Sequence, residues 1–213
     1  MTKETMTIHQ ALVELKTLDK RIATAIRAVT YVVANKHSNN KISGIPVKEY
    51  VEGARSQYQK VNDLLKRREA IKRAVVKSNA VTEVVVAGKT YTVAEAIDMK
   101  NHGVDNLKAL LKQLTSDYTT AKMMAERSNG SELERRADEH VRNMYGVSDM
   151  KGFVEEAKKV RAEFIEAQTM ELLDPIGVVA EINRLEAEIN EFEVNVDAAL
   201  SVSNALTSIE IDY

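Results

Sequence analysis

The chain has 213 residues, no cysteine and no tryptophan, and its 30 Lys and Arg against 32 Asp and Glu give a formal net charge of −2. The lack of cysteine excludes a disulfide framework, a thiolate metal site and a cysteine nucleophile. Only 2 Pro and 8 Gly favour long uninterrupted helices over the many turns of a compact α/β enzyme. No window approaches the roughly 18 apolar residues of a membrane span and the first residues are polar, so we expect a cytoplasmic chain with no targeting segment.

The small net charge hides a gradient along the chain. Residues 1–80 carry a net charge of +9, residues 81–148 a net charge of −1 and residues 149–213 a net charge of −10. Two interpretations are open. The basic and acidic parts dock on each other, or the basic part meets an anionic ligand or nucleic acid.

Apolar residues at heptad spacing predict a first helix over 7–35, with the pattern that is typical of coiled-coil packing. A polar segment that ends at Pro46 separates it from a second helix over 47–77. Two helices of similar length joined by a modest loop are expected to pack as an antiparallel hairpin. The heptad positions of the first helix are Ile8, Leu15, Ile22 and Val29, with Ala11, Leu18, Ala25 and Val32 as companions.

A β-hairpin is expected after the second helix, with strands over 82–86 and 89–92 and a turn at Gly88. Thr92 and Glu95 then have the Ser/Thr-x-x-Glu spacing of a capping box, which predicts the start of a third helix.

The second half of the chain is expected to be helical almost to its last residues. Ser131 and Glu134 form a second capping box, and Pro175 ends a helix because the residue before proline avoids the α region. The predicted elements are helices over 132–144, 149–173 and 177–201 and a strand over 206–211.

One short phrase, Ser-Asn-Ala-Val/Leu-Thr, occurs twice, at 78–82 and 203–207, each time between helix-period and strand-period sequence. Asn79 and Asn204 are therefore expected at helix ends, in the left-handed conformation that asparagine tolerates. Because a two-stranded hairpin is marginal in water, we expect the C-terminal strand to join the hairpin. A ligand-binding role for the paired Ser and Asn side chains is the alternative.

Together these elements predict a mainly α fold, an elongated antiparallel helical bundle of coiled-coil hairpins with a small three-stranded β-sheet formed by 82–86, 89–92 and 206–211. We expect a single elongated domain over 1–213. Its sections are a basic helical hairpin over 7–77, a β-hairpin over 78–92, middle helices over 93–145, an acidic helical hairpin over 149–201 and a C-terminal strand over 206–211.

Several stretches of the chain resemble a known group of proteins. They run from Ala11 to Ile22, from Lys77 to Thr82, from Ala87 to Ile97 and from Ser203 to Thr207. They resemble uncharacterised helical proteins of phages and prophages of Gram-positive bacteria and, more distantly, the bacterial family labelled septicolysin-like. The resemblance covers most of the chain and implies a phage setting, but it implies no activity and no site.

The sequence lacks the motifs of common phosphate-binding, catalytic and metal sites. Gly88-Lys89-Thr90 lacks the upstream glycine of a phosphate loop, and no Gly-x-Ser-x-Gly elbow is present. We therefore expect no enzyme, no catalytic residue, no metal site and no cofactor. The histidines, which lack metal-ligand spacing, are His9, His37, His102 and His140.

Basic residues cluster on the second helix, where Lys66, Arg73 and Lys77 share one face. Lys89 and Tyr91 of the expected hairpin could join this face. Arginine side chains, a lysine and an aromatic ring that can stack would together suit a phosphate ligand. The alternative is a solvated basic face, or one matched by the acidic residues Glu186, Glu188, Glu191 and Glu193 of the last helix. The candidate ligand-binding residues are Lys66, Arg73, Lys77, Asn79, Lys89, Tyr91 and Asn204.

The sequence therefore favours a non-enzymatic, oligomeric, phage-type protein that acts by binding. We expect a homo-oligomer that sequesters a host protein or an anionic signalling nucleotide in the host cell cytoplasm, with an anti-defence role. No membrane partner is expected, and the negative total charge argues against nucleic acid. The alternative is a structural or assembly protein of the virion.

Overall fold

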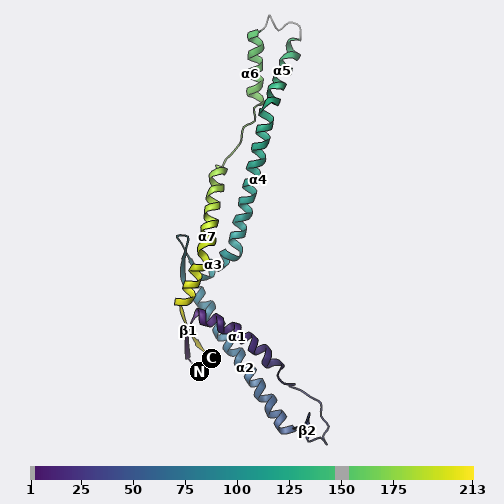
Figure 1. Cartoon of the computed structure of the whole chain (residues 1–213), viewed down its shortest axis with the longest axis vertical. Coiled ribbons are helices and arrows are strands. Elements are labelled where there is room, and N and C mark those ends of the chain that lie inside the picture. Colours follow the sequence, from purple (N-terminus) through teal and green to yellow (C-terminus); the bar gives the residue numbers. More distant parts are fainter. Residues whose placement is uncertain (1–2, 147–153) are drawn as a thin grey trace. The chain divides into compact units, whose positions relative to one another are not determined.

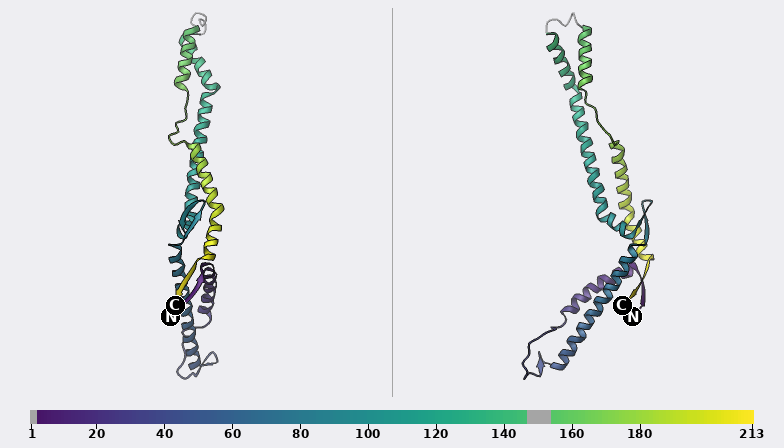
Figure 2. Two further views of the ribbon diagram at one scale, coloured as in Figure 1. Left: turned by 90° about the vertical axis from the view of Figure 1, so that its left-hand side faces the viewer. Right: turned by 180° about the vertical axis from the view of Figure 1, so that it is seen from behind.

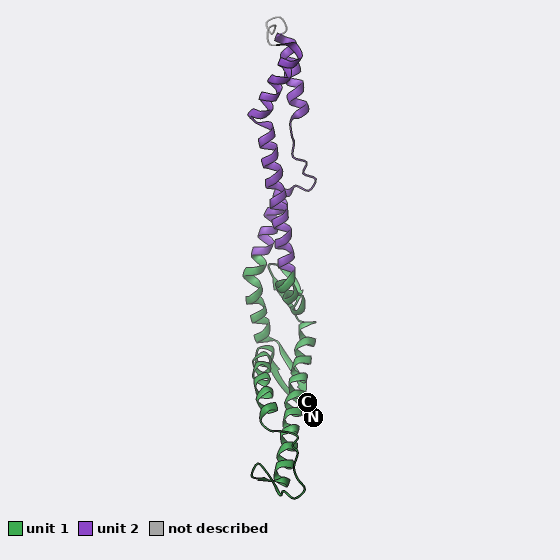
Figure 3. Cartoon of the chain, turned by 90° about the vertical axis from the view of Figure 1, so that its right-hand side faces the viewer, with its two compact units in different colours: residues 1–102, 191–213 green, residues 103–190 purple. Residues whose placement is uncertain are grey.

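The structure, a computed structural model, describes residues 3–146 and 154–213 (Figure 1). The chain divides into two compact units, one of Met1–His102 with Glu191–Tyr213 and one of Gly103–Asn190 (Figure 3). The single domain that the sequence predicts over 1–213 stays a prediction. In chain order the elements are β1 (Lys3–Thr7), α1 (Ile8–Arg27), β2 (Lys41–Ile42), β3 (Ile45–Pro46), α2 (Val47–Asn79), β4 (Glu83–Val86), β5 (Lys89–Thr92), α3 (Val93–Asp98), the π-helical turn η1 (Met99–Gly103), α4 (Val104–Asn129), α5 (Ser131–Tyr145), α6 (Val154–Gln168), α7 (Val178–Leu206) and β6 (Ser208–Asp212).

The mainly α fold is confirmed, since 73% of the described residues are helical. The first helix is shorter than predicted, because α1 ends at Arg27 and not at residue 35. One carbonyl of its last turn accepts from a side chain of α2, since Gln57 Nε2 donates to the Ala25 carbonyl oxygen at 2.9 Å. Val32, predicted in the seam, lies beyond the helix and is 86% exposed.

The antiparallel hairpin of α1 and α2 is confirmed, and the two helices lie side by side in both views of Figure 2. Burying apolar side chains of the heptad seam removes them from water and stabilises the pair. Thr7 opens α1 with a capping box, in which its side chain accepts from the Gln10 N–H. The buried seam residues of α1 are Ile8, Ala11, Leu15, Leu18, Ile22 and Ala25, and those of α2 are Val61, Leu64, Ile71 and Val75.

The predicted three-stranded sheet is wrong. Among the described residues the strands form three two-stranded antiparallel sheets, in which β6 pairs with β1, β2 with β3 and β4 with β5. The C-terminal strand therefore joins residues 3–7 and not the hairpin. The reason is burial, because Met6, Ile209 and Ile211 all enter the core of α1 and α2, whereas the buried Val84 and Val86 of the hairpin lie outside that core.

The left-handed conformation predicted for Asn79 and Asn204 is also wrong. Asn79 is the last residue of α2 and Asn204 lies inside α7. Among the described residues other than glycine, only Ser43 and Ala87 have positive φ. Helical hydrogen bonds continue through each phrase, so these helix ends need no residue with positive φ.

The two copies of the phrase nevertheless build the same supersecondary unit. The Thr82 carbonyl accepts from the Val93 N–H at 2.8 Å, and the Thr207 carbonyl accepts from the Ile8 N–H at 2.9 Å. Each acceptor follows a long helix, and each donor is the first residue of a helix that opens with a threonine capping box. The unit of β4 and β5 and the unit of β6 and β1 are therefore structurally equivalent, with the same strand register relative to the caps.

The second compact unit contains α5 and α6 packed side by side. The imidazole of His140 stacks on the ring of Phe164 with centroids 4.6 Å apart, and Arg161 Nε lies 2.7 Å from Asp138 Oδ1. Residues 149–153 of the predicted helix over 149–173 lie outside the described residues. The described part of that helix, α6, ends at Gln168.

Candidate functional site

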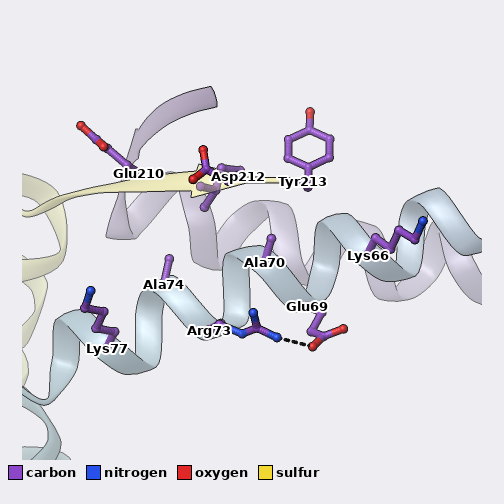
Figure 4. Close-up of a pocket in the computed structure, with 10 residues that line it drawn as sticks. Lys66, Glu69, Ala70, Arg73, Ala74, Lys77, Glu210, Asp212 and Tyr213 are labelled. Atoms are coloured by element: carbon purple, nitrogen blue, oxygen red, sulfur yellow. Dashed lines mark hydrogen bonds and ion pairs between the residues drawn. The ribbon is translucent and has the colours of Figure 1, made fainter. Parts of the chain in front are cut away.

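A hollow of about 420 Å³ lies between α2 and β6 in the first compact unit (Figure 4). It brings together three of the predicted ligand-binding residues on one wall, all from α2. None of its lining residues comes from α1 or β1, so the hollow lies on the side of β6 that faces away from β1. The lining residues are Lys66, Glu69, Ala70, Arg73, Ala74, Lys77, Glu210, Ile211, Asp212 and Tyr213.

The α2 wall carries the cations Lys66, Arg73 and Lys77, and all three are exposed. Arg73 Nη2 lies 2.6 Å from Oε1 of Glu69, one helical turn earlier. In the described part of the chain, neither Lys66 nor Lys77 has a carboxylate within ion-pair distance. An exposed ion pair of this kind contributes little to stability, so the three cations are available to a ligand.

The floor and the other wall have a different character. Ala70 and Ala74 are half-buried and small, and they leave space between the helix and the strand. On β6, Glu210 and Asp212 are exposed and project away from α2 (Figure 4). The hollow is therefore of mixed charge, with cations on the helix and carboxylates on the outer face of the strand.

Arg67 anchors Tyr213, a lining residue of the hollow, although the sequence does not single Arg67 out. It is bound by both carboxylate oxygens of Glu14 on α1, by Glu4 on β1 at 2.8 Å and by the hydroxyl of Tyr213. The hydrogen bonds that Arg67 donates to Glu14 and Glu4 raise the pKa of Arg67, and the bond from Arg67 lowers the pKa of Glu4. The only sequence signal is position, because Arg67 borders the buried stripe between Leu64 and Ile71.

The basic face of α2 is matched in part by its own hairpin. Besides Arg67, Arg68 pairs with Asp19 of α1 at 2.5 Å. These ion pairs neutralise Arg67 and Arg68, which point toward α1 and β1. They do not involve the three cations that line the hollow. The predicted match to the acidic residues of the last helix stays a prediction.

The other four predicted ligand-binding residues do not line this hollow. Asn79 and Asn204 lie near helix ends, and Lys89 lies on β5. The ring of Tyr91 packs edge-on against Phe192 of α7, with centroids 5.8 Å apart. Tyr91, predicted as a stacking ring for the ligand, therefore does not join the basic face of α2, because it packs on α7.

The repeated unit creates a second hollow, of about 680 Å³, between β4 and α7. It is the structural equivalent of the first, because β4 corresponds to β6 and the end of α7 to the end of α2. Its lining contains neither lysine nor arginine, and two of its residues, Val85 and Val202, are exposed apolar side chains. In equivalent order, the residues Ala70, Arg73, Ala74, Lys77, Glu210 and Asp212 of the first hollow correspond to Asn195, Ala198, Ala199, Val202, Val85 and Ala87 of the second.

Other kinds of site are not found in the part of the chain that the structure describes. No group of His, Asp or Glu there could hold a metal ion, and no helix there has the length and apolar character needed to cross a membrane. The chain matches no family model, no curated protein and no solved structure. The hollow between α2 and β6 is therefore the candidate on geometry and charge alone.

Proposed function

We propose that this chain works by binding and not by catalysis, and that it holds acidic groups of its partner in the hollow between α2 and β6. The partner is a host protein or a nucleotide that the chain sequesters, in keeping with the phage setting that the sequence resemblance implies. The observation that carries the proposal is the wall of three exposed cations, Lys66, Arg73 and Lys77, on one face of α2 beside an open hollow.

The second, structurally equivalent hollow between β4 and α7 shows what this fold looks like without the cations of the α2 wall. At the equivalent positions, Arg73 and Lys77 are replaced by Ala198 and Val202. The shared fold therefore does not require cations there, since the same strand and helix pack without them. Charge that the fold does not need is better explained by a ligand, and Arg and Lys are the side chains that bind carboxylates and phosphates.

Thermal shift with a panel of acidic ligands tests the proposal. The panel holds mono-, di- and triphosphate nucleotides, cyclic nucleotides and acidic peptides, each at millimolar concentration. A ligand that binds only the folded chain raises its melting temperature by mass action. We expect a rise with the native chain and none with the triple variant Lys66→Gln, Arg73→Gln and Lys77→Gln.

The matched control is the triple variant Lys16→Gln, Lys20→Gln and Lys72→Gln. It removes the same charge from exposed positions of the first compact unit outside the hollow. It should keep the rise. A panel without any rise, or rises lost equally in both triple variants, would overturn the proposal.

A second candidate function, self-assembly, has its own observation. In the described part of the chain α4 has 26 residues and one buried residue, Val104. Its apolar stripe is only half-buried and follows helical spacing, so one face of the helix has no complete partner. The stripe consists of Leu107, Leu111, Leu114 and Tyr118.

Light scattering tests self-assembly. If a homo-oligomer covers this stripe, Leu114→Glu places a charge in the interface. The oligomer should then dissociate, and the measured molar mass should fall. Met123→Glu is the control, because Met123 is 57% exposed and is not part of the stripe. A monomeric mass for the native chain at micromolar concentration would exclude this candidate.

A further inference from the structure

We propose that the outer edge of β6 is a strand-addition site, which binds an extended peptide segment of another protein whose residues alternate between acidic and basic. The inference rests on the proposed function, since it names the partner of the same hollow. It commits to a peptide main chain paired with β6 and not to a free nucleotide.

In the described part of the chain, β6 pairs with β1 alone, and no backbone group bonds to its outer edge. In an antiparallel ladder, alternate residues point both N–H and C=O to the same neighbour. The Ile8 N–H donates to the Thr207 carbonyl, so the register of β1 with β6 turns the groups of Ile209 and Ile211 toward β1. The groups of Ser208, Glu210 and Asp212 then face the hollow. Such an edge is a template for another strand.

The hollow has the length of one short strand. Its α2 wall runs from Lys66 to Lys77, which is about 17 Å at the rise of an α-helix. The five residues of β6 span about 17 Å at the rise of a strand. A third strand beside β6 would lie over Ala70 and Ala74, whose small side chains leave the space that it needs.

Charge decides the sequence of the partner. Side chains of an added strand point alternately to the two faces of the sheet. Those on the α2 side would meet Lys66, Arg73 and Lys77, which favours acidic residues. Those on the outer side would lie across from Glu210 and Asp212, which favours basic residues. A second copy of β6 fits poorly, because antiparallel pairing centred on Glu210 would place two glutamates opposite each other.

Fluorescence anisotropy with a labelled heptapeptide of alternating Lys and Glu tests the proposal at low salt. The control peptide has the same composition in the order Lys-Lys-Glu-Glu, so both signs occur on each face. We expect the alternating peptide to bind at least about tenfold more tightly. N-methylation of the lysines should abolish binding in an antiparallel pairing, whereas N-methylation of the glutamates should leave it within about threefold.

Proline variants test the edge from the other side. Glu210→Pro removes an N–H that faces the hollow and leaves the pairing with β1, as proline on an edge strand can. It should abolish peptide binding, while Glu210→Gln keeps the N–H, loses only the carboxylate and should weaken binding by no more than about fivefold. Val85→Pro is the matched control, because Val85 is the equivalent residue of β4, and it should leave binding unchanged. Circular dichroism confirms the fold of each variant.

The outcomes separate the two proposals. If both N-methylated peptides bind like the parent, or if Glu210→Pro binds as well as Glu210→Gln, strand addition is overturned. If nucleotides bind in the thermal-shift panel and the alternating peptide does not bind, strand addition falls and the proposed function stands. If neither binds, both fall. In a parallel pairing the N–H groups of the peptide's glutamates face β6. Methylation of the glutamates then abolishes binding, methylation of the lysines does not, and strand addition is supported with the peptide parallel to β6.

Discussion

Arg67 of α2 is in contact with Tyr213, the residue that follows β6. The guanidinium carbon lies 4.6 Å from the centroid of the tyrosine ring, and Arg67 Nη1 donates to the tyrosine hydroxyl. The same guanidinium binds Glu14 of α1 and Glu4 of β1. One side chain thus ties four segments together, and one of its partners, Tyr213, lines the hollow.

Replacement of Arg67 should therefore destabilise the first compact unit. Arg67→Ala removes charge-assisted hydrogen bonds from a side chain that is 18% exposed and leaves Glu14 without its partner. We expect a loss of about 2 kcal/mol in the free energy of unfolding, measured by urea unfolding. Arg73→Ala is the control, since Arg73 is 77% exposed, and its cost should stay below about 0.5 kcal/mol. Equal effects of the two substitutions would contradict the role of Arg67.

The same cluster predicts a dependence on pH. The hydrogen bond from Arg67 lowers the pKa of Glu4 below its ordinary value. A carboxyl with a lower pKa in the folded state adds stability above its unfolded pKa and loses it as pH falls through the folded pKa. The native chain should therefore lose stability more steeply than Glu4→Gln between about pH 5 and about pH 3. Parallel stability profiles of the two proteins, followed by circular dichroism, would refute this.

Patterns of local origin were predictable from the sequence. The heptad of α1 predicts its buried positions from Ile8 to Ala25, and the capping box of Thr92 and Glu95 predicts the start of α3. The end of α1 was placed too late in the chain, and one of the contacts made there comes from Gln57, which is distant in sequence. The partner of β6 was missed for the same reason, since residues 3–7 have little apolar alternation and become a strand through the core that they cover.

The candidate site follows the same division. Lys66, Arg73 and Lys77 share a face because helical spacing alone puts them there, so the sequence identifies that wall. The other wall comes from β6, whose place depends on a non-local pairing with β1. Tyr91 could not be placed either, because its neighbour Phe192 lies about a hundred residues away in sequence. Helical spacing in the sequence predicts which residues share one side of a helix. What packs against that side depends on contacts between residues far apart in the chain.

The seam between α1 and α2 gives a prediction on stability. Leu18 is fully buried in the core of the hairpin, so Leu18→Asp would bury an unpaired charge. We expect a loss of about 3–5 kcal/mol or unfolding of this hairpin. Leu12 lies on the same helix and is 42% exposed, so Leu12→Asp should change stability by about 0.5 kcal/mol at most. The seam assignment fails if the two variants melt at the same temperature.

The equivalence of the two strand units predicts that the chain tolerates circular permutation. Lys3 and Asp212 are paired in register, at the place where Ala87 and Gly88 form the turn of the equivalent hairpin. Those two turn residues have φ of 50° and 75°, so an Asn-Gly linker, which favours such turns, should take the places of Asp212 and Lys3 and join Ile211 to Glu4, the pair that matches Val86 and Lys89. The linker also replaces Tyr213, so Arg67 keeps its contacts with Glu14 and Glu4 only.

In this permutant the chain would be opened between Ala87 and Gly88. It should keep the helical circular dichroism of the native chain, because each strand keeps its partner and each helix its cap. The control keeps the linker and opens the chain inside α2, after Leu64, which interrupts the buried stripe and should prevent folding. The equivalence fails if the turn-opened permutant is as unfolded as the control, since the two units would then differ in what holds their strands together.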